Sequence, residues 1–179
     1  MQIGDIGNAG AAAEGKPLDG VRILALEQMQ ALPYATQLLA RLGADVIKVE
    51  HPTGGDLARG SLPAMVQPDG GKAGATFLRN NLNKRSITVD LKNPVGRELI
   101  LQLAPKFDIV AENFKGGALT RMGLGYDDVR AVHPGVVYLS VSGFGNTVES
   151  PYGAWPAYAA VAEAMSGVYE WKRQPDQPP

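Results

Sequence analysis

Alternating runs of apolar and polar residues divide most of the chain into short strands and helices. A nearly continuous apolar run, VRILAL at residues 21–26, predicts a parallel strand that is covered on both faces. Pro33 suits the first turn of a helix, and apolar residues follow it at helical spacing as far as Gly43. ADVIKVE at 44–50 predicts a second strand, so this part of the chain is expected to form a βαβ unit.

The same alternation continues toward the carboxyl terminus. After a loop rich in Gly and Pro at 51–74, SITVDLK at 86–92 predicts a strand, and Asn93 and Pro94 predict the cap and first turn of a helix. A strand at FDIVAEN, two short helices, a strand at GVVYLSVSGFG and a helix that ends at Gly167 are expected next. Strands that alternate with helices predict an α/β fold, an open, mostly parallel Rossmann-like sheet with helices on both faces.

The chain is expected to hold one domain behind an arm. Residues 1–16 are rich in Gly and Ala without a period, which predicts a flexible arm, and residues 17–179 are predicted to form the α/β domain. The first residues include acids and no basic stretch, and no apolar run approaches about 18 residues. Neither a signal peptide nor a membrane-spanning helix is therefore expected.

Composition and charge mainly exclude certain classes of partner and of chemistry. Hydrophobic residues make up 45% of the chain and charged residues 20%, which is typical of a globular protein with a real core. A formal net charge of -1 provides no general attraction to nucleic acid or to a membrane surface. The absence of cysteine excludes disulfides and thiolate chemistry and favours a cytoplasmic location, and no histidines stand at metal-ligand spacing, so no metal is expected.

The loop after the first strand, EQMQALP at 27–33, contains no glycine. A dinucleotide fingerprint needs glycines at this point, so that the backbone can approach a pyrophosphate. The hypothesis of a nicotinamide-dependent oxidoreductase therefore rests on Glu50 alone. Glu50 is correctly placed for a ribose, but it is equally well interpreted as a solvent-facing strand end. Gln28 and Gln30 stand at the carboxyl end of the strand, where open α/β sheets bind their ligands.

Two further segments carry weaker signals. NNLNKRSITVDLK at 80–92 brings three basic residues around a strand, a run that more often forms a solvated edge than a phosphate site. AENFKGGALTRMG at 111–123 runs from a strand end through two glycines into a short helix, whose N–H groups would attract an anion. Taken alone, this second segment is best interpreted as a plain strand-to-helix connection.

Together these segments resemble the class III CoA-transferase family, which includes formyl-CoA transferases, carnitine CoA-transferases and α-methylacyl-CoA racemases. The resemblance runs from PLDGVRILALEQMQALPYATQLLARLGADVIKVE through GGDLARG, NLNKRSITVDLKNPVGRELI and DIVAENFKGGALTRMGLGYDDVRAVHPGVVYLSVSGFG to Pro178 and Pro179. It covers essentially everything after the arm. It implies the amino-terminal part of a class III CoA-transferase fold.

The resemblance also implies a ligand, coenzyme A in the form of an acyl-CoA substrate, across the carboxyl ends of the first strands. It places Met29, Gln30 and Ala31 at the thioester, with Gln30 beside the reacting carbonyl, where an amide can donate to a developing oxyanion. The other positions that it implies for coenzyme binding are His51, Lys92, Asn113, Phe114, Arg121, Met122 and Tyr158.

The chain departs from the family pattern at three places. His51 stands where many relatives have an arginine, which would weaken one phosphate contact. Tyr158 and Ala159 stand where racemases carry a histidine and an acid, and racemization needs such an acid/base pair. The nucleophilic aspartate of the family's transferases follows the proline pair and would lie beyond residue 179, and Asp176 does not replace it on positional grounds.

The resemblance thus implies an enzyme that moves CoA from an acyl-CoA to a carboxylic acid through an aspartyl nucleophile. The alternatives are an α-methylacyl-CoA racemase, another acyl-CoA enzyme of the family, or a non-catalytic CoA-binding fragment. Because family members are longer and form intertwined homodimers, this chain is expected to be an amino-terminal portion that is inactive alone and prone to aggregate or pair. Nucleic acid and membranes are not expected as partners.

Overall fold

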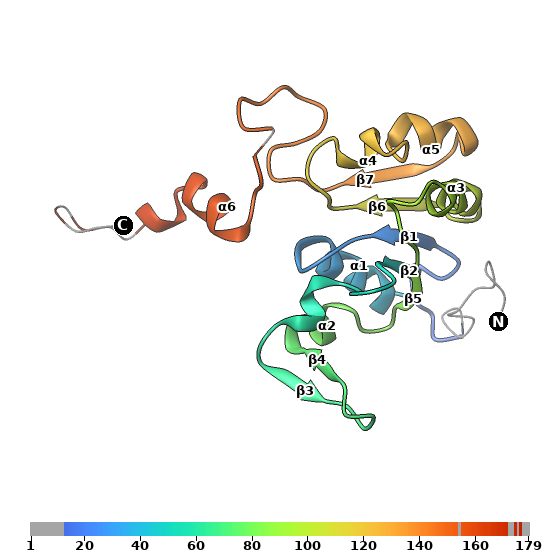
Figure 1. Cartoon of the computed structure of the whole chain (residues 1–179), viewed down its shortest axis with the longest axis horizontal. Helices are drawn as coiled ribbons and strands as arrows, with labels where there is room; N and C mark the ends of the chain where they lie inside the picture. Colours follow the sequence, from blue (N-terminus) through green and yellow to red (C-terminus); the bar gives the residue numbers. More distant parts are fainter. Residues whose placement is uncertain (1–12, 154, 172–173, 175, 177–179) are drawn as a thin grey trace.

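The computed structural model describes residues 13–153, 155–171, 174 and 176. At its centre lies a five-stranded sheet in the order β5-β2-β1-β6-β7, in which all neighbouring strands are parallel (Figure 1). The strands are β1 (Arg22–Leu26), β2 (Asp45–Glu50), β5 (Arg85–Thr88), β6 (Ile109–Glu112) and β7 (Val137–Ser140). The predicted open, mostly parallel α/β sheet is confirmed.

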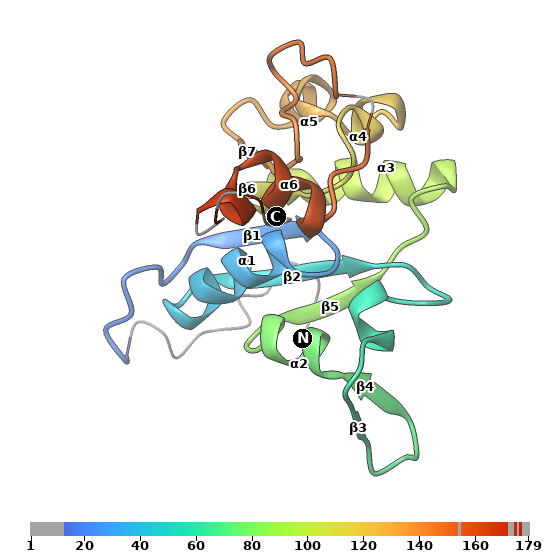
Figure 2. The same ribbon diagram turned by 90° about the vertical axis from the view of Figure 1, so that its left-hand side faces the viewer.

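Helices cover both faces of the sheet, as the apolar strands predicted (Figures 1 and 2). Ile23 and Ala25 of β1 belong to the core cluster that includes residues of α1, whereas Leu24 and Leu26 belong to the cluster that includes residues of α3 and α5. This split follows from the strand geometry, in which successive side chains point to opposite faces. The helices are α1 (Ala31–Arg41), α2 (Ala75–Asn80), α3 (Pro94–Leu103), α4 (Ala118–Arg121), α5 (Tyr126–Val132) and α6 (Ala159–Met165).

The segment 51–74 is not the plain loop that its Gly and Pro content predicted. It contains a 3₁₀ turn at Leu57–Gly60 and an antiparallel hairpin of β3 (Ala64–Val66) and β4 (Lys72–Gly74), which projects at the bottom of Figure 1. Strands of three residues are too short to show the alternation that reveals longer ones. The sequence pattern therefore could not distinguish this hairpin from a loop.

Element boundaries differ from the predictions by a few residues. The predicted strand at 86–92 ends at Thr88, and the predicted start of α3 is confirmed, because the Asn93 side chain accepts a hydrogen bond of 3.0 Å from the Val95 N–H. The last helix ends at Met165, before Gly167, whose φ of 75° stops the helix. In Figure 1, α6 stands apart from the sheet, and none of its residues is buried.

Some predictions fall on residues outside the described ranges. Residues 1–12, which make up most of the predicted arm, and the proline pair Pro178 and Pro179 are among them. The proposed division at residue 16 therefore stays a prediction. Among the helices described, none is long and apolar enough to cross a bilayer.

Candidate active site

The strand order reverses between β1 and β6, and the loops that follow these two strands are joined directly. The Gln28 N–H donates to Oδ1 of Asn113 at 2.8 Å, and Nδ2 of Asn113 donates to the Gln28 carbonyl at 2.9 Å. Such a reversal is the position at which open α/β sheets bind ligands. The structure therefore brings Gln28, which directly precedes the predicted thioester positions 29–31, beside the predicted Asn113–Phe114 segment.

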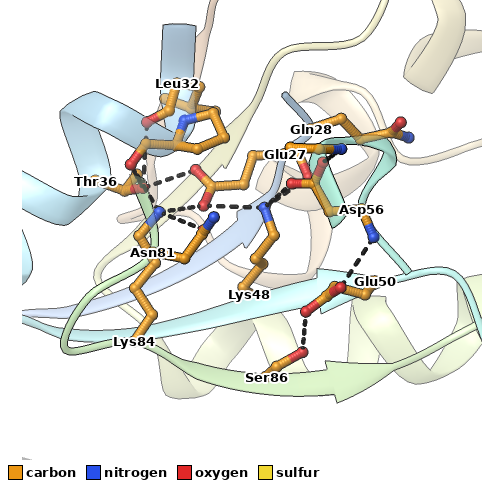
Figure 3. Close-up of polar contacts among 12 residues, drawn as sticks. Glu27, Gln28, Leu32, Thr36, Lys48, Glu50, Asp56, Asn81, Lys84 and Ser86 are labelled. Carbon is orange, nitrogen blue, oxygen red and sulfur yellow. Dashed lines mark hydrogen bonds and ion pairs between the residues drawn. The ribbon is translucent and has the colours of Figure 1, made fainter. Parts of the chain in front are cut away.

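Beneath this junction lies a group of four charged side chains, Glu27, Lys48, Asp56 and Lys84, which we call the buried charge network (Figure 3). Each side chain is at most 1% exposed. Lys48 Nζ lies 2.7 Å from Oδ2 of Asp56 and 3.5 Å from Oε1 of Glu27, and Lys84 Nζ lies 2.7 Å from the same Glu27 oxygen. Two acids and two amines balance formally, so no charge of the network is left without an opposite partner.

Hydrogen bonds tie the network to the surrounding elements. Thr36 of α1 donates to Oε2 of Glu27 at 2.7 Å, and Lys84 donates to the Pro33 carbonyl at 2.7 Å and to Oδ1 of Asn81 at 3.0 Å (Figure 3). Burial lowers the pKa of Lys84 to about 8, although the charge and hydrogen bond of Glu27 act in the opposite direction. Losing one member of a buried ion pair costs about 3–5 kcal/mol, because the other charge stays behind.

The backbone turns sharply at Met29. Its φ is 66°, in the left-handed region, which costs a residue other than glycine roughly 1–2 kcal/mol. The Met29 side chain is 44% exposed, so its own burial does not compensate for this strain. The Met29 N–H instead donates to Oδ1 of Asp56 at 3.0 Å.

Glu50 is buried, which corrects the prediction of a solvent-facing strand end. Its carboxylate accepts hydrogen bonds from Arg59 Nε at 2.6 Å and Nη2 at 2.8 Å, from Ser86 Oγ at 2.6 Å and from the Asp56 N–H at 2.9 Å. Burial by itself would raise the pKa of Glu50, but these contacts outweigh it and lower the pKa to about 2. The oxygens that a ribose would need are therefore already engaged, and residue 50 joins β2, β5 and the following loop.

The basic run at 80–92 is likewise not a simple solvated edge. Lys84 is buried in the network, and Arg85 Nε donates to Oδ1 of Asp45 at 3.1 Å, at the amino edge of the sheet. Lys92 alone of the three is exposed, in the turn after β5, where its N–H donates to Asp90 Oδ1 at 2.9 Å. The error has a physical cause, because the prediction took no account of buried acids that approach from other strands.

A further buried acid, Glu112, lies at the carboxyl end of β6. Glu112 is 5% exposed, and it accepts hydrogen bonds from the Phe114 N–H at 2.8 Å and from Ser140 Oγ of β7. Burial raises the pKa of Glu112, which these two hydrogen bonds partly offset. Asn146 extends the contact, since its Oδ1 accepts from the Gly117 N–H at 3.3 Å. The segment from Asn113 to Gly117 is thus held from both of its ends.

The remaining predicted coenzyme positions follow the same carboxyl edge, at different distances from the junction. His51 comes directly after β2, and its Nδ1 accepts from the Thr53 N–H at 3.2 Å. Phe114 and Met122 are half-buried and pack against the core, and Arg121 is exposed at the end of α4. Tyr158 is 75% exposed and lies on the β7 side of the sheet. The preceding residue, Ala157, packs closely against Gly143 after β7, because a Cβ added at Gly143 would lie 1.8 Å from the Ala157 Cβ.

Comparison with known proteins assigns this arrangement to a family. The sequence model described as CoA-transferase family III matches residues 18–179. The chain belongs to CoA-transferase family III. The family that the motifs predicted is therefore confirmed.

Named relatives of this family III chain are CoA-transferases. Formyl-CoA:oxalate CoA-transferase of Streptomyces coelicolor is 44% identical over 164 residues, which are 92% of this chain and 38% of that protein. Succinyl-CoA:glutarate CoA-transferase of Homo sapiens is 43% identical over 153 residues, which are 86% of this chain and 34% of that protein. The chain thus spans about two fifths or less of the length of these curated relatives.

Solved structures agree with the family fold. The crystal structure of a CAIB/BAIF family protein from Brucella suis matches with a TM-score of 0.83 and 39% identity, covering 92% of this chain and 43% of that one. A hypothetical protein from Mycobacterium tuberculosis matches with a TM-score of 0.79 and 38% identity, covering 92% of this chain and 44% of that one.

Sequence reasoning missed the charges that organise this family III site. Glu27, Lys48, Asp56 and Glu112 were not singled out, although each stands in or beside an apolar strand or a glycine pair. One signal was available. Lys48 interrupts VIKVE, a strand of a sheet that was predicted to have helices on both faces, and a lysine buried there requires an acid as its partner.

Proposed function

We propose that the protein transfers CoA from an acyl-CoA to a carboxylic acid, with the acyl-CoA lying across the carboxyl ends of β1, β2 and β6. The observation that carries the proposal is the reciprocal pair of hydrogen bonds between Gln28 and Asn113, which sets the loop 28–31 beside Phe114 at the reversal of strand order. Membership of family III and the names of the relatives support the same reaction class.

At the thioester end, Met29, Gln30 and Ala31 line the reacting group. The carboxamide of Gln30 donates a hydrogen bond to the thioester oxygen as negative charge develops on it. An aspartyl carboxylate outside residues 1–179 attacks the thioester carbonyl and displaces the CoA thiolate, so that the acyl group passes to the enzyme as a mixed anhydride. The exposed side of the loop supports this role, because both Met29 and Gln30 are solvent-accessible.

At the nucleotide end, Lys92 and Arg121 meet the phosphates, because cationic donors form strong hydrogen bonds to phosphate oxygens. His51 makes a weaker phosphate contact than the arginine that many relatives have at its position. Phe114 and Met122 offer apolar surface to the pantetheine chain. Asn113 contributes indirectly, since its side-chain amide bonds Gln28 through both of its polar atoms. Tyr158 approaches from the β7 side, on the segment that packs against Gly143.

We also propose a location and an assembly for the whole protein. We place it in the cytoplasm as an intertwined homodimer, with acyl-CoA and carboxylic acids as its small-molecule partners. The exposed apolar residues around α6 support a partner surface.

Calorimetry with CoA tests the binding site on the 179-residue chain. We expect Arg121→Ala and Lys92→Ala each to weaken CoA binding by about tenfold, the loss of one charge-assisted contact. Lys106→Ala is the matched control, because this exposed lysine precedes β6 at the opposite edge of the sheet. The CoA affinity of this variant should equal that of the wild type.

Unchanged affinity in both site variants would refute the binding site. The whole protein, incubated with acyl-CoA and a series of carboxylic acids, tests the transfer by the appearance of a new thioester. CoA binding without transfer would identify a non-catalytic CoA-binding protein, and exchange at the α carbon of a 2-methylacyl-CoA would identify a racemase.

A further inference from the structure

The turn between β1 and α1 is held almost entirely by side chains from other elements. The Glu27 carbonyl accepts from Lys48 Nζ at 3.1 Å, the Gln28 N–H and carbonyl bond the Asn113 side chain, and the Met29 N–H donates to Asp56. Four consecutive backbone groups are therefore engaged by buried or half-buried partners. A glycine-rich loop presents such groups to a phosphate, whereas this loop withdraws them from any ligand.

Asp56 occupies the central place in this arrangement. It is 1% exposed, its Oδ1 accepts from the N–H groups of Met29 and Ala58 at 3.0 and 2.8 Å, and its Oδ2 pairs with Lys48 at 2.7 Å. Its own N–H donates to Glu50 at 2.9 Å (Figure 3). Arg59 Nε in turn donates to Glu50 at 2.6 Å. The position of Asp56 is therefore set independently of any ligand.

We infer that Asp56 is a positioning residue for the thioester, and this inference rests on the proposed function. By holding Met29 in the left-handed conformation, Asp56 directs the Gln30 side chain toward the acyl group and keeps the loop from relaxing when the ligand is absent. Lys48 keeps Asp56 in place and joins it to the Glu27 carbonyl on the other side of the turn. The strain at Met29 is thus maintained by charge buried below the loop.

The two ends of the coenzyme should respond differently to the loss of Asp56. Asp56 contacts the thioester loop and not the segments that carry Lys92 and Arg121. Its loss should therefore weaken the binding of acyl-CoA and leave the binding of the nucleotide portion unchanged. A general loss of stability would instead weaken the binding of both. Adenosine 3′,5′-bisphosphate, which lacks the pantetheine and thioester, therefore serves as the comparison ligand for acetyl-CoA.

The test uses Asp56→Ala and Asp56→Asn in the 179-residue chain. Asparagine can still accept from the Met29 N–H through Oδ1, whereas alanine cannot, so we expect Met29 amide exchange to rise by about tenfold or more in Asp56→Ala and by less in Asp56→Asn. Acetyl-CoA affinity should fall by about tenfold in Asp56→Ala, with partial rescue in Asp56→Asn, while adenosine 3′,5′-bisphosphate affinity stays at the wild-type value.

Asp45→Asn is the matched control, because Asp45 is also a buried, ion-paired carboxylate, 4% exposed, but lies at the amino edge of the sheet. It should leave Met29 exchange and acetyl-CoA affinity unchanged. Wild-type Met29 exchange in Asp56→Ala, or an equal loss of affinity for both ligands, would overturn the inference. If Asp56→Ala does not fold, the same two measurements on Asp56→Asn decide. If the wild-type chain bound neither ligand, the proposed function would fail, and Met29 exchange would still decide whether Asp56 holds the turn.

Discussion

At the scale of single residues, the site depends on buried acids more than on exposed groups. Glu27, Glu50 and Asp56 are each at most 4% exposed, and each forms an ion pair with a lysine or an arginine. They do not face the proposed ligand position themselves. They fix the backbone from which Met29 and Gln30 project, in the way that a second layer of residues orients a catalytic group.

The pKa of Glu50 predicts a defined loss of stability in acid. Its pKa is lowered from 4.5 to about 2 in the fold, so on acidification the unfolded chain binds the proton first. The stabilising contribution is therefore complete above about pH 4.5 and is lost as the pH falls toward about 2. We expect the free energy of unfolding, measured by urea titration, to fall more steeply below pH 4.5 in the wild type than in Glu50→Gln.

Glu98→Gln provides the control for this pH series, because Glu98 is exposed on α3 and should retain the wild-type slope. Parallel pH profiles for the wild type and Glu50→Gln would show that the contacts of Glu50 with Arg59 and Ser86 do not hold the carboxylate ionised.

At the scale of elements, α3 shows how a helix start is adapted to the strand below it. Asn93 caps the helix and Pro94 occupies its first turn, as the sequence predicted. Gly96 then lies so close to the exit of β5 that an added Cβ would stand 2.2 Å from the Asp90 carbonyl oxygen. The glycine serves close packing between helix and turn, and the nearby Lys92 is placed by the same turn.

Gly96→Ala should therefore destabilise the protein, although alanine is the better helix former by about 1 kcal/mol. The clash with backbone at Asp90 is expected to lower the free energy of unfolding by about 1–3 kcal/mol, measured by chemical denaturation. Gly60→Ala is the control, since a Cβ there meets nothing within 4 Å, and it should change stability by no more than about 0.5 kcal/mol. Equal or greater stability of Gly96→Ala would contradict the close approach.

At the scale of the whole molecule, large apolar side chains remain uncovered away from the central sheet. Leu62 beside the β3–β4 hairpin is 87% exposed, and Tyr158 and Trp171, which flank α6, are 75% and 83% exposed. Single exposed apolar residues are common, but several on elements that project from the fold favour association with another protein. Figure 1 shows both elements projecting from the sheet.

The 179-residue chain is expected to self-associate. Sedimentation velocity should show species larger than a monomer whose fraction grows with concentration, because association removes apolar surface from water. Met165→Lys combined with Val168→Lys, at side chains that are 56% and 53% exposed, should shift the chain toward monomer. Val95→Lys on α3, where the side chain is 70% exposed, should not do so. A wild-type chain that stays monomeric throughout the concentration series would refute this expectation.

Much of the fold could be predicted because its signals are local. The apolar strand 21–26, the Asn93–Pro94 helix start and Gly167 each act within a few residues of the chain, and the structure confirms the elements that they predicted. The hairpin in 51–74 could not be predicted, because three-residue strands carry no detectable period. The roles assigned to individual site residues stay predictions.

The sequence by itself determined the order along the chain of the strands of the central sheet, the α/β class and the family, because periodicity, capping residues and motifs are written in neighbouring positions, whereas β3, β4 and α2 were not predicted. Only the tertiary structure decided which charges lie buried together. Lys84 meets Glu27 across 57 positions and Asn113 meets Gln28 across 85. A charged residue in a sequence looks the same whether it faces water or a partner. Its state depends on the dielectric surroundings and the opposite charge that folding brings to it, and these exist only once distant segments have packed.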